Sequence, residues 1–350
     1  MEGSINTITI TGLIINGSGG TLDLGAGFTH IFTGTLTRTA GTLNVNTSTF
    51  KVTTASGTGG TFTATSGIVE YTGAAPAVSV VSYNDLVLSG GGTATGAVTT
   101  VNGDLTMSSD TVWSASAITS TLASVTLSGT SSLTIGANMT ISGALTINAG
   151  TFNANNLNVT AGSLSSSNSS TRAITMGSGT WELTSTGTVW DTATTTGLTL
   201  TPNASTVKLT NNSATGKTFA GGGQIYNNFW FAPTTGTGTL TITGANTFND
   251  FKDDGTGAHT IVFPAGVNTT IQSLTLDTDS AQLITLQSST PTSYWNLVDT
   301  AGTNTVLYVS ITDSCASGGA TWDANSATNF DGGHNFEWAF PGSGIVISGT

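Results

Sequence analysis

The stretch that decides the fold is residues 226–298, in which one short phrase occurs four times: YNNFWF at 226–231, FNDF at 248–251, IQSLTL at 271–276 and YWNLV at 294–298. The leading apolar residues, Tyr226, Phe248, Ile271 and Tyr294, are 22, 23 and 23 positions apart. Each phrase places apolar residues two apart, as in a strand with one buried face. Short strands that recur at this spacing indicate one coil of a solenoid per repeat.

A similar period runs through the first half of the chain. Equivalent apolar positions, about 20 residues apart, are Leu22, Leu43, Phe62, Leu86, Leu105, Val125 and Leu145. Asn-Gly and Asp-Gly turns, which would mark the hairpins of a sandwich, are scarce, and no segment has the apolar stripe of a helix. We therefore predict an all-β chain that forms a right-handed, single-stranded parallel β-helix with coils of about 20–23 residues.

The predicted solenoid covers residues 1–312, with a looser register over 148–223. The remaining residues, 313–350, are predicted to form a C-terminal cap and tail, because the last coil of a solenoid would otherwise expose strand edges and apolar ladder residues. The tail could add a strand to a neighbouring chain or be disordered.

Composition excludes several classes of function. The net charge is −12, from 18 acidic and 6 basic residues, so the surface repels phosphate backbones and we expect no nucleic-acid partner. No apolar run is long enough to predict a membrane span. The first residues lack the basic and apolar regions of a signal peptide. Cys315 is the single cysteine, so no intrachain disulfide is expected.

The C-terminal segment resembles an ending found in β-repeat surface proteins of bacteria and in phage tail or fibre proteins. The resemblance rests on DSCASGGATW at 313–322 and NFDGGHNFEWAF at 329–340. It implies an extracellular protein or a virion component whose solenoid ends in a Trp-rich cap.

Three acidic residues follow the period of the repeats. Asp254, Asp277 and Asp299 are 23 and 22 positions apart, which predicts that they stack on one corner of adjacent coils. Carboxylates about 5 Å apart would suit a retaining glycosidase, so these are the weak catalytic candidates. Solvated turns or a bound cation would explain the same spacing. Asp250, Asp253 and Asp254 form a loose candidate site for Ca²⁺, and we otherwise expect no cofactor.

Aromatic residues are the candidates for ligand binding. Tyr226, Trp230 and Trp295 could stack on sugar rings if they face outward, or they could be ladder residues inside the coil. Alternation places Phe229 and Phe231 on one face of their strand and Trp230 on the other.

We therefore expect a non-enzymatic structural or adhesive component of an extracellular assembly. The favoured form is a phage virion protein, such as a tail fibre, a spike or a capsid decoration, that contacts cell-surface glycans and is located on the virion or another extracellular surface. Its expected partners are copies of itself, in a homo-oligomer for which a homotrimer is the candidate form, and other virion or surface proteins. The alternatives are a tailspike glycosidase that cleaves polysaccharide, and a bacterial surface adhesin or filament subunit.

Overall fold

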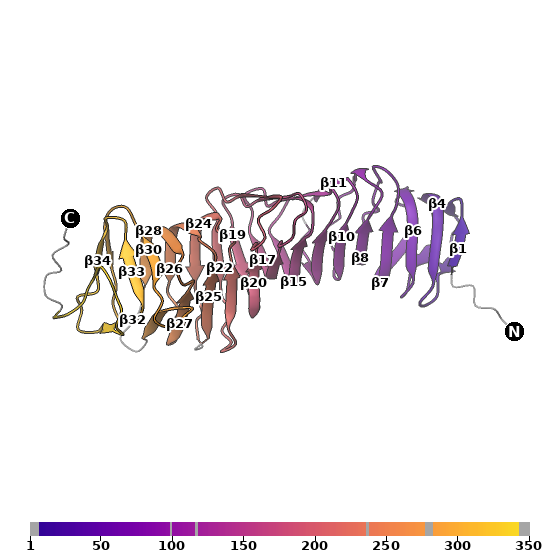
Figure 1. The fold of residues 1–350 in the computed structure, drawn as a ribbon. Helices are drawn as coiled ribbons and strands as arrows, with labels where there is room; N and C mark the ends of the chain where they lie inside the picture. The colour runs from indigo at the N-terminus through magenta and orange to yellow at the C-terminus, as the bar shows by residue number, and fades with distance from the viewer. Residues whose placement is uncertain (1–6, 99, 116–117, 236–237, 277–282, 343–350) are drawn as a thin grey trace. The chain divides into compact units, whose positions relative to one another are not determined.

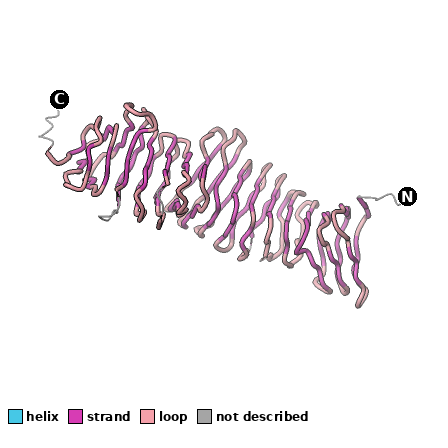
Figure 2. The backbone as a smooth tube through the Cα atoms, turned by 90° about the horizontal axis from the view of Figure 1, so that it is seen from below, coloured by secondary structure: helices cyan, strands magenta, loops and turns pink. Residues whose placement is uncertain are grey.

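The computed structural model describes residues 7–98, 100–115, 118–235, 238–276 and 283–342, and these residues form strands and turns without a helix (Figure 2). The strands make up 55% of the structure and lie in parallel sheets that stack as a β-solenoid of about 15 turns (Figure 1). The predicted all-β parallel β-helix is confirmed. Within the described residues, no helix is long and apolar enough to cross a membrane.

The chain divides into two compact units. Unit 1 comprises Met1–Ala161, Ser170–Gly177 and Thr196–Thr199, and unit 2 comprises Gly162–Ser169, Ser178–Thr195 and Leu200–Thr350. Two strands have residues in each unit, β17 (Val159–Ser165) and β21 (Leu198–Thr201).

Short parallel strands form unit 1. They are β1 (Thr7–Ile10), β2 (Leu13–Ile15), β3 (Thr21–Asp23), β4 (Thr29–Arg38), β5 (Thr42–Asn44), β6 (Thr49–Ser56), β7 (Thr61–Tyr71), β8 (Tyr83–Leu88), β9 (Gly92–Thr93), β10 (Asp104–Met107), β11 (Thr111–Ala115), β12 (Thr121–Leu122), β13 (Ser124–Leu127), β14 (Ser132–Ile135), β15 (Met139–Ile147), β16 (Gly150–Asn153) and β18 (Arg172–Thr175).

Inward-facing residues of unit 1 form apolar ladders, because equivalent positions of successive coils pair in register. One ladder consists of Phe50, Val69, Leu86, Leu105, Val125 and Leu145, all of them buried. Leu22, Leu43 and Phe62 pair in the same way at a second position of the coil. The predicted pairing is confirmed within each ladder, but the predicted equivalence of Phe62 and Leu86 is wrong: β7 contributes Phe62 to one ladder and Val69 to the other, and Leu86 pairs with Val69. Each buried side chain contributes about 1.5–3 kcal/mol.

Unit 2 continues the same pattern. Its strands are β19 (Thr180–Leu183), β20 (Gly187–Asp191), β22 (Thr206–Leu209), β23 (Lys217–Ala220), β24 (Ile225–Phe231), β25 (Thr239–Thr243), β26 (Thr247–Asp253), β27 (His259–Phe263), β28 (Asn268–Leu276), β29 (Ile284–Ser288), β30 (Trp295–Val298), β31 (Thr303–Thr305), β32 (Val309–Ile311), β33 (Ser314–Ser317), β34 (Thr321–Asp323), β35 (Phe330–Asp331) and β36 (Trp338–Ala339).

The first three phrases of the deciding stretch stack as predicted. Tyr226 lies opposite Phe248, which lies opposite Ile271. Three residues further along, Phe229, Phe251 and Leu274 form the neighbouring ladder. Their side chains are buried, and the Phe229 and Phe251 rings stack with centroids 5.1 Å apart.

The fourth phrase is out of the predicted register. In β30, Asn296 lies opposite Asn268 at the start of β28, so Leu297 pairs with Thr269 and not with Leu274. The step between paired residues is 28 positions here, from 268 to 296, whereas it is 22 or 23 in the earlier coils. A constant spacing of apolar residues assumes corners of constant length, and this coil has longer ones.

Parallel pairing also runs through the predicted boundary at residue 313. β33 pairs with β30, β34 with β31, β35 with β32 and β36 with β34. The indoles of Trp322 and Trp338 are buried, with ring centroids 5.1 Å apart. The Trp-rich segment thus fills the interior of the last described coils.

Candidate functional site

Of the three candidate catalytic aspartates, the two that the structure describes, Asp254 and Asp299, are not brought together as predicted. Asp254 accepts a hydrogen bond from Trp230 Nε1 at 2.5 Å and lies 2.9 Å from Lys252 Nζ. Asp299 is buried and accepts hydrogen bonds from Asn304 Nδ2 at 2.9 Å and from the Ala301 N–H. Asp277 lies outside the described residues.

The predicted stacking of Asp254 and Asp299 is wrong. Asp253 lies opposite Leu276 at the end of β28, whereas Val298 lies opposite Thr270 near its start. Asp254 follows the residue opposite position 276 of β28, and Asp299 follows the residue opposite position 270. The two aspartates are therefore offset by six residues along β28, because the fourth phrase is out of register.

The three candidate calcium ligands face different groups. The Asp250 carboxylate accepts a hydrogen bond from Ser273 Oγ, Asp253 is buried, and Asp254 contacts Trp230 and Lys252. Within the described residues, no group of three His, Cys, Asp or Glu side chains could hold a metal ion.

Asp253 instead forms a pair with a buried histidine that the sequence analysis did not identify. His259 Nε2 lies 2.6 Å from Asp253 Oδ2, and His259 Nδ1 donates to the Gly257 carbonyl. Burial opposes the charged imidazolium, but the hydrogen bond and charge of Asp253, together with the Gly257 carbonyl, outweigh it and raise the pKa of His259. The buried Lys217 acts in the opposite direction on His259. Lys217 Nζ donates to the Ser213 carbonyl, and burial lowers its own pKa.

Two of the three candidate aromatic residues are interior residues. Tyr226 is buried, and its hydroxyl accepts a hydrogen bond from Trp190 Nε1 at 3.0 Å. Trp295 is buried with its ring stacked on Phe263, at a centroid distance of 4.3 Å and an interplanar angle of 8°. Neither ring is accessible to a sugar.

Trp230 is the outward-facing member of this set, and lysine side chains cover its ring. Lys208 on β22 and Lys252 on β26 lie opposite Trp230 on the coils to either side. Their Nζ atoms are 3.9 Å and 4.4 Å from the ring centroid, close enough for cation–π attraction. Because one ammonium group comes from each flanking strand, the faces of the indole are occupied and Trp230 presents only its edge.

A column of hydrogen-bonding side chains runs beside Trp230 on the same outer surface. Thr206, Asn228, Asp250 and Ser273 lie opposite one another on successive strands. Ser273 Oγ donates to Asp250 at 2.5 Å, and Asn228 Nδ2 donates to Thr206 at 3.4 Å. Such a column offers donors and acceptors to a polyhydroxylated ligand but contains no catalytic pair.

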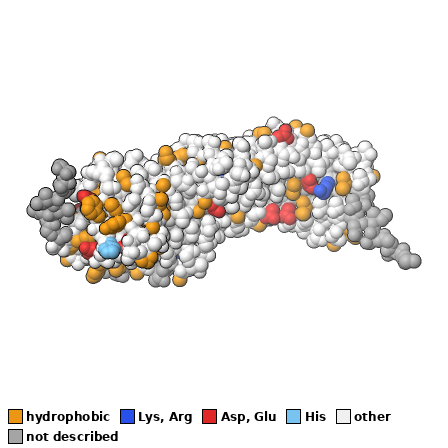
Figure 3. Space-filling model, viewed as in Figure 1, with side chains coloured by type: hydrophobic (Ala, Val, Ile, Leu, Met, Phe, Trp, Pro, Cys, Tyr) orange, Lys and Arg blue, Asp and Glu red, His pale blue; other side chains and the backbone are white. Residues whose placement is uncertain are grey.

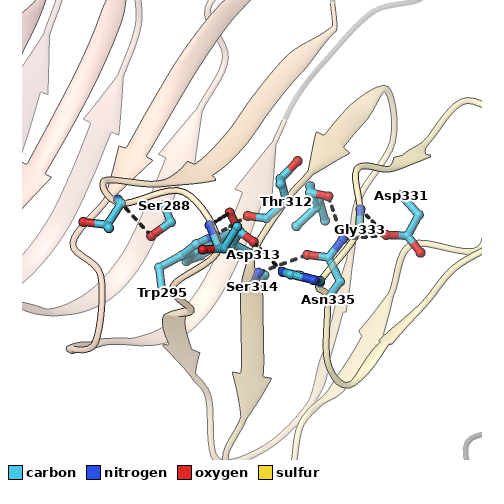
Figure 4. A network of polar contacts seen from close by, with 12 residues as sticks. Ser288, Trp295, Thr312, Asp313, Ser314, Asp331, Gly333 and Asn335 are labelled. Atoms are coloured by element: carbon cyan, nitrogen blue, oxygen red, sulfur yellow. Dashed lines mark hydrogen bonds and ion pairs between the residues drawn. The ribbon is translucent and has the colours of Figure 1, made fainter.

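The last coils carry a polar network that the sequence analysis missed (Figure 4). The Asp313 carboxylate accepts the Thr292 N–H at 3.0 Å and lies 3.3 Å from His334 Nδ1. Asn335 Nδ2 donates to Asp331 at 2.7 Å, and Asn335 Oδ1 accepts the Ser314 N–H at 3.0 Å.

This network borders a surface hollow of about 310 Å³. Asp313 and His334 line it together with Thr292, Thr312 and Gly333. The predicted cap included Asp313 and His334, which are 21 positions apart, close to the period of the repeats, but the period was predicted only as far as residue 312. The feature of the sequence that could have pointed to this hollow is the Asp-Gly-Gly-His-Asn segment, because such residues favour turns with positive φ.

A second hollow, of about 370 Å³, is lined by residues that follow in the same segment. Phe336 and Glu337 line it, with Trp322, Gly318 and Gly319. The segment 331–337 therefore contributes side chains to each of two neighbouring hollows in unit 2.

Burial, and then the nearby Glu337 carboxylate, raise the pKa of the Cys315 thiol.

Comparisons with known proteins add no further constraint on the site. No protein-family model, curated protein or solved structure matches the chain.

Proposed function

We propose that this chain is a non-enzymatic structural and adhesive component of an extracellular assembly. The observation that carries the proposal is the division of each coil into an apolar interior and a neutral polar exterior. Inward ladders such as Phe50, Val69 and Leu86 are fully buried, while outward positions hold Thr, Ser and Asn. Most of the surface in Figure 3 is neither charged nor hydrophobic.

This construction suits a part that maintains a fixed spacing and displays a surface. Every coil pairs with its neighbours through backbone hydrogen bonds and buried side chains, so stability accumulates along the stack. A neutral surface rich in hydroxyl and amide groups can hydrogen-bond to sugar hydroxyls without repelling them electrostatically. We propose that the outer surface contacts cell-surface glycans.

The setting of the aspartates supports the non-enzymatic form of the proposal. Asp254 is held by Lys252 and Trp230, and Asp299 is buried against Asn304. A glycosidase needs two carboxylates that face one sugar across a few ångströms. The different registers of Asp254 and Asp299 disfavour that role for this pair.

Within this class, we propose a virion protein, such as a phage tail fibre, spike or capsid decoration. The resemblance of residues 313–340 to the ends of phage fibre and bacterial β-repeat proteins supports this choice. Mass spectrometry of purified particles from the source tests it: we expect peptides of the chain at a fixed ratio to the capsid protein. If the chain is absent from particles and present on the bacterial surface, the adhesin alternative replaces the virion proposal.

We also propose that copies of the chain associate, with a trimer as the expected form. Light scattering of the purified chain should then give one discrete mass. A mass that grows with concentration would contradict a closed oligomer and support the filament alternative.

A further inference from the structure

We propose that the two hollows beside residues 331–337 form one binding site for a neutral oligosaccharide. The inference rests on the proposed contact with glycans and assigns that contact to a particular site. It places the site on the last coils of unit 2 and not on the surface around Trp230.

The first hollow offers a carboxylate whose acceptor capacity is only partly used. The Asp313 side chain is 8% exposed, and its oxygens contact the Thr292 N–H at 3.0 Å and His334 Nδ1 at 3.3 Å. A carboxylate can accept about four hydrogen bonds. The His334 side chain is 64% exposed, and its Nδ1 faces Asp313, which leaves Nε2 as the second polar atom of the ring. Asp313 and His334 can therefore bind neighbouring hydroxyl groups of one sugar ring.

Three residues at this hollow have left-handed backbone angles. Thr292, Asp313 and His334 have φ angles of 67°, 58° and 54°, in the left-handed region. A β-branched residue such as Thr292 is rare there, and each such residue costs on the order of 1–3 kcal/mol. Strained residues that converge on one hollow are typical of ligand sites.

The second hollow offers an exposed aromatic side chain. The Phe336 side chain is 51% exposed and lines the hollow next to the exposed Glu337. Trp322, which also lines the hollow, is 2% exposed and forms its floor. Exposed aromatic rings stack on the C–H faces of sugars.

The segment between the hollows connects them into one site. Gly333 and His334 line the first hollow, and Phe336 and Glu337 line the second. Figure 3 shows hydrophobic side chains gathered over this end of unit 2, at the left of the view. Adjacent sugars of one chain could occupy the two hollows, so an oligosaccharide should bind more tightly than a monosaccharide.

Local charge favours a neutral ligand over an acidic one. Asp313 and Glu337 line the hollows, Asp331 lies between them, and no Lys or Arg follows Lys252 in the chain. Uronic acids, sialic acids and phosphorylated sugars would be repelled. The carboxylates would attract positively charged amino sugars, so the test below compares neutral oligosaccharides with amino sugars.

The test uses the whole chain on an array of neutral, uronic-acid-containing and amino-sugar oligosaccharides. The neutral tetrasaccharide with the strongest signal is then titrated by calorimetry. We expect Phe336→Ala and His334→Ala each to weaken its binding by about tenfold or more, since they remove a stacking face and a hydrogen-bonding group. Both side chains are exposed, so the variants should fold. The control is Phe330→Ala, which removes an equally exposed side chain (59%) that lines neither hollow.

The outcomes separate this inference from the proposed function. If the chain binds neutral glycans and both hollow variants bind as tightly as the unmodified chain, the site assignment is overturned while the glycan contact stands. Preference for acidic or amino sugars would overturn the neutral ligand. If the chain binds no glycan, this inference and the glycan contact both fail, and the structural role is then judged by the particle analysis alone.

Discussion

His259 Nε2 lies 2.6 Å from Asp253 Oδ2, and both side chains are fully buried inside unit 2. Asp253 occupies an inward ladder position between Phe231 and Leu276, and His259 lies opposite Ile284. His259 Nδ1 faces the Gly257 carbonyl, so each ring nitrogen faces an oxygen atom. A neutral imidazole has only one N–H to donate, and the geometry therefore favours imidazolium with an ionised carboxylate.

The stability of unit 2 should fall as the pH rises above about 6.5 and through the folded pKa of His259. The pKa of folded His259 is raised above the value of 6.5 expected for the unfolded chain. Protonation therefore favours the folded state: its contribution is complete below pH 6.5 and is lost as the pH rises through the folded pKa. Urea unfolding followed by Trp fluorescence at pH 5.5 and pH 8.5 should give the higher midpoint at pH 5.5.

Breaking the pair should cost more than replacing it. Asp253→Asn leaves His259 buried without its counter-charge and should destabilise the protein by about 3–5 kcal/mol at pH 5.5. The double substitution Asp253→Leu with His259→Leu should be close to neutral, because it extends the apolar ladders, and it should remove the pH dependence. A fall in stability with rising pH that persists in the double variant would assign the effect to another group; Lys217 is not a candidate, because its lowered pKa makes stability rise with pH.

Interior and exterior positions of one strand should respond very differently to truncation. Phe229→Ala removes a fully buried ring that contacts Phe219, Phe248 and Phe251, and should cost about 3–5 kcal/mol. Asn228→Ala, one residue earlier and facing outward, should change the stability by less than about 0.5 kcal/mol. Urea unfolding of both variants checks the difference, and equal effects would contradict the orientation of β24.

Position 318 should require glycine for two reasons: its φ is positive, and the backbone of Asp299 lies close to its Cα. Gly318 has φ +99°, and a Cβ there would lie 2.3 Å from the Asp299 carbonyl oxygen. Gly302 has φ +88°, but a Cβ there would meet no atom within 4 Å. Both Ala substitutions should cost about 1–2 kcal/mol for the left-handed backbone. Gly318→Ala should lower the melting temperature further than Gly302→Ala, and equal melting temperatures would argue against the close contact.

The lysines beside Trp230 should contribute modestly and in a salt-dependent way. Lys208→Met removes one cation–π contact and should cost about 0.5–1 kcal/mol. Lys252→Met removes a second contact and also the ion pair with Asp254, so it should be the more costly change. The difference between the two variants should shrink in 1 M NaCl, because salt screens exposed ion pairs. An unchanged difference would assign it to packing of the lysine chains.

The repeats predict the coil because a solenoid pairs equivalent positions of successive turns. Apolar residues at Leu86, Leu105, Val125 and Leu145 can all be buried at once only if the strands stack in parallel at that period. The same argument fails at the fourth phrase, where a longer coil shifts Asn296 to pair with Asn268. Spacing alone cannot show how many residues a corner contains.

The site residues were harder to predict because their roles depend on contacts made across corners and between coils. Trp230 is correctly placed outside by alternation, but its faces are covered by lysines that lie 22 residues away in either direction. Asp253 resembles a solvated turn residue until His259 is seen beside it. Only the folded coil shows these contacts.

The sequence by itself determined the all-β character, the parallel solenoid and the identity of most interior ladders. The reason is that apolar residues at a regular period are all buried when parallel strands stack with that period. The tertiary structure alone decided which polar residues meet: Asp253 with His259, and Asp313 with His334. The physical reason is that the lengths and backbone angles of the corners decide which side chains come within hydrogen-bond distance, across one corner for Asp253 and His259 and between coils for Asp313 and His334. These vary from coil to coil and follow no period.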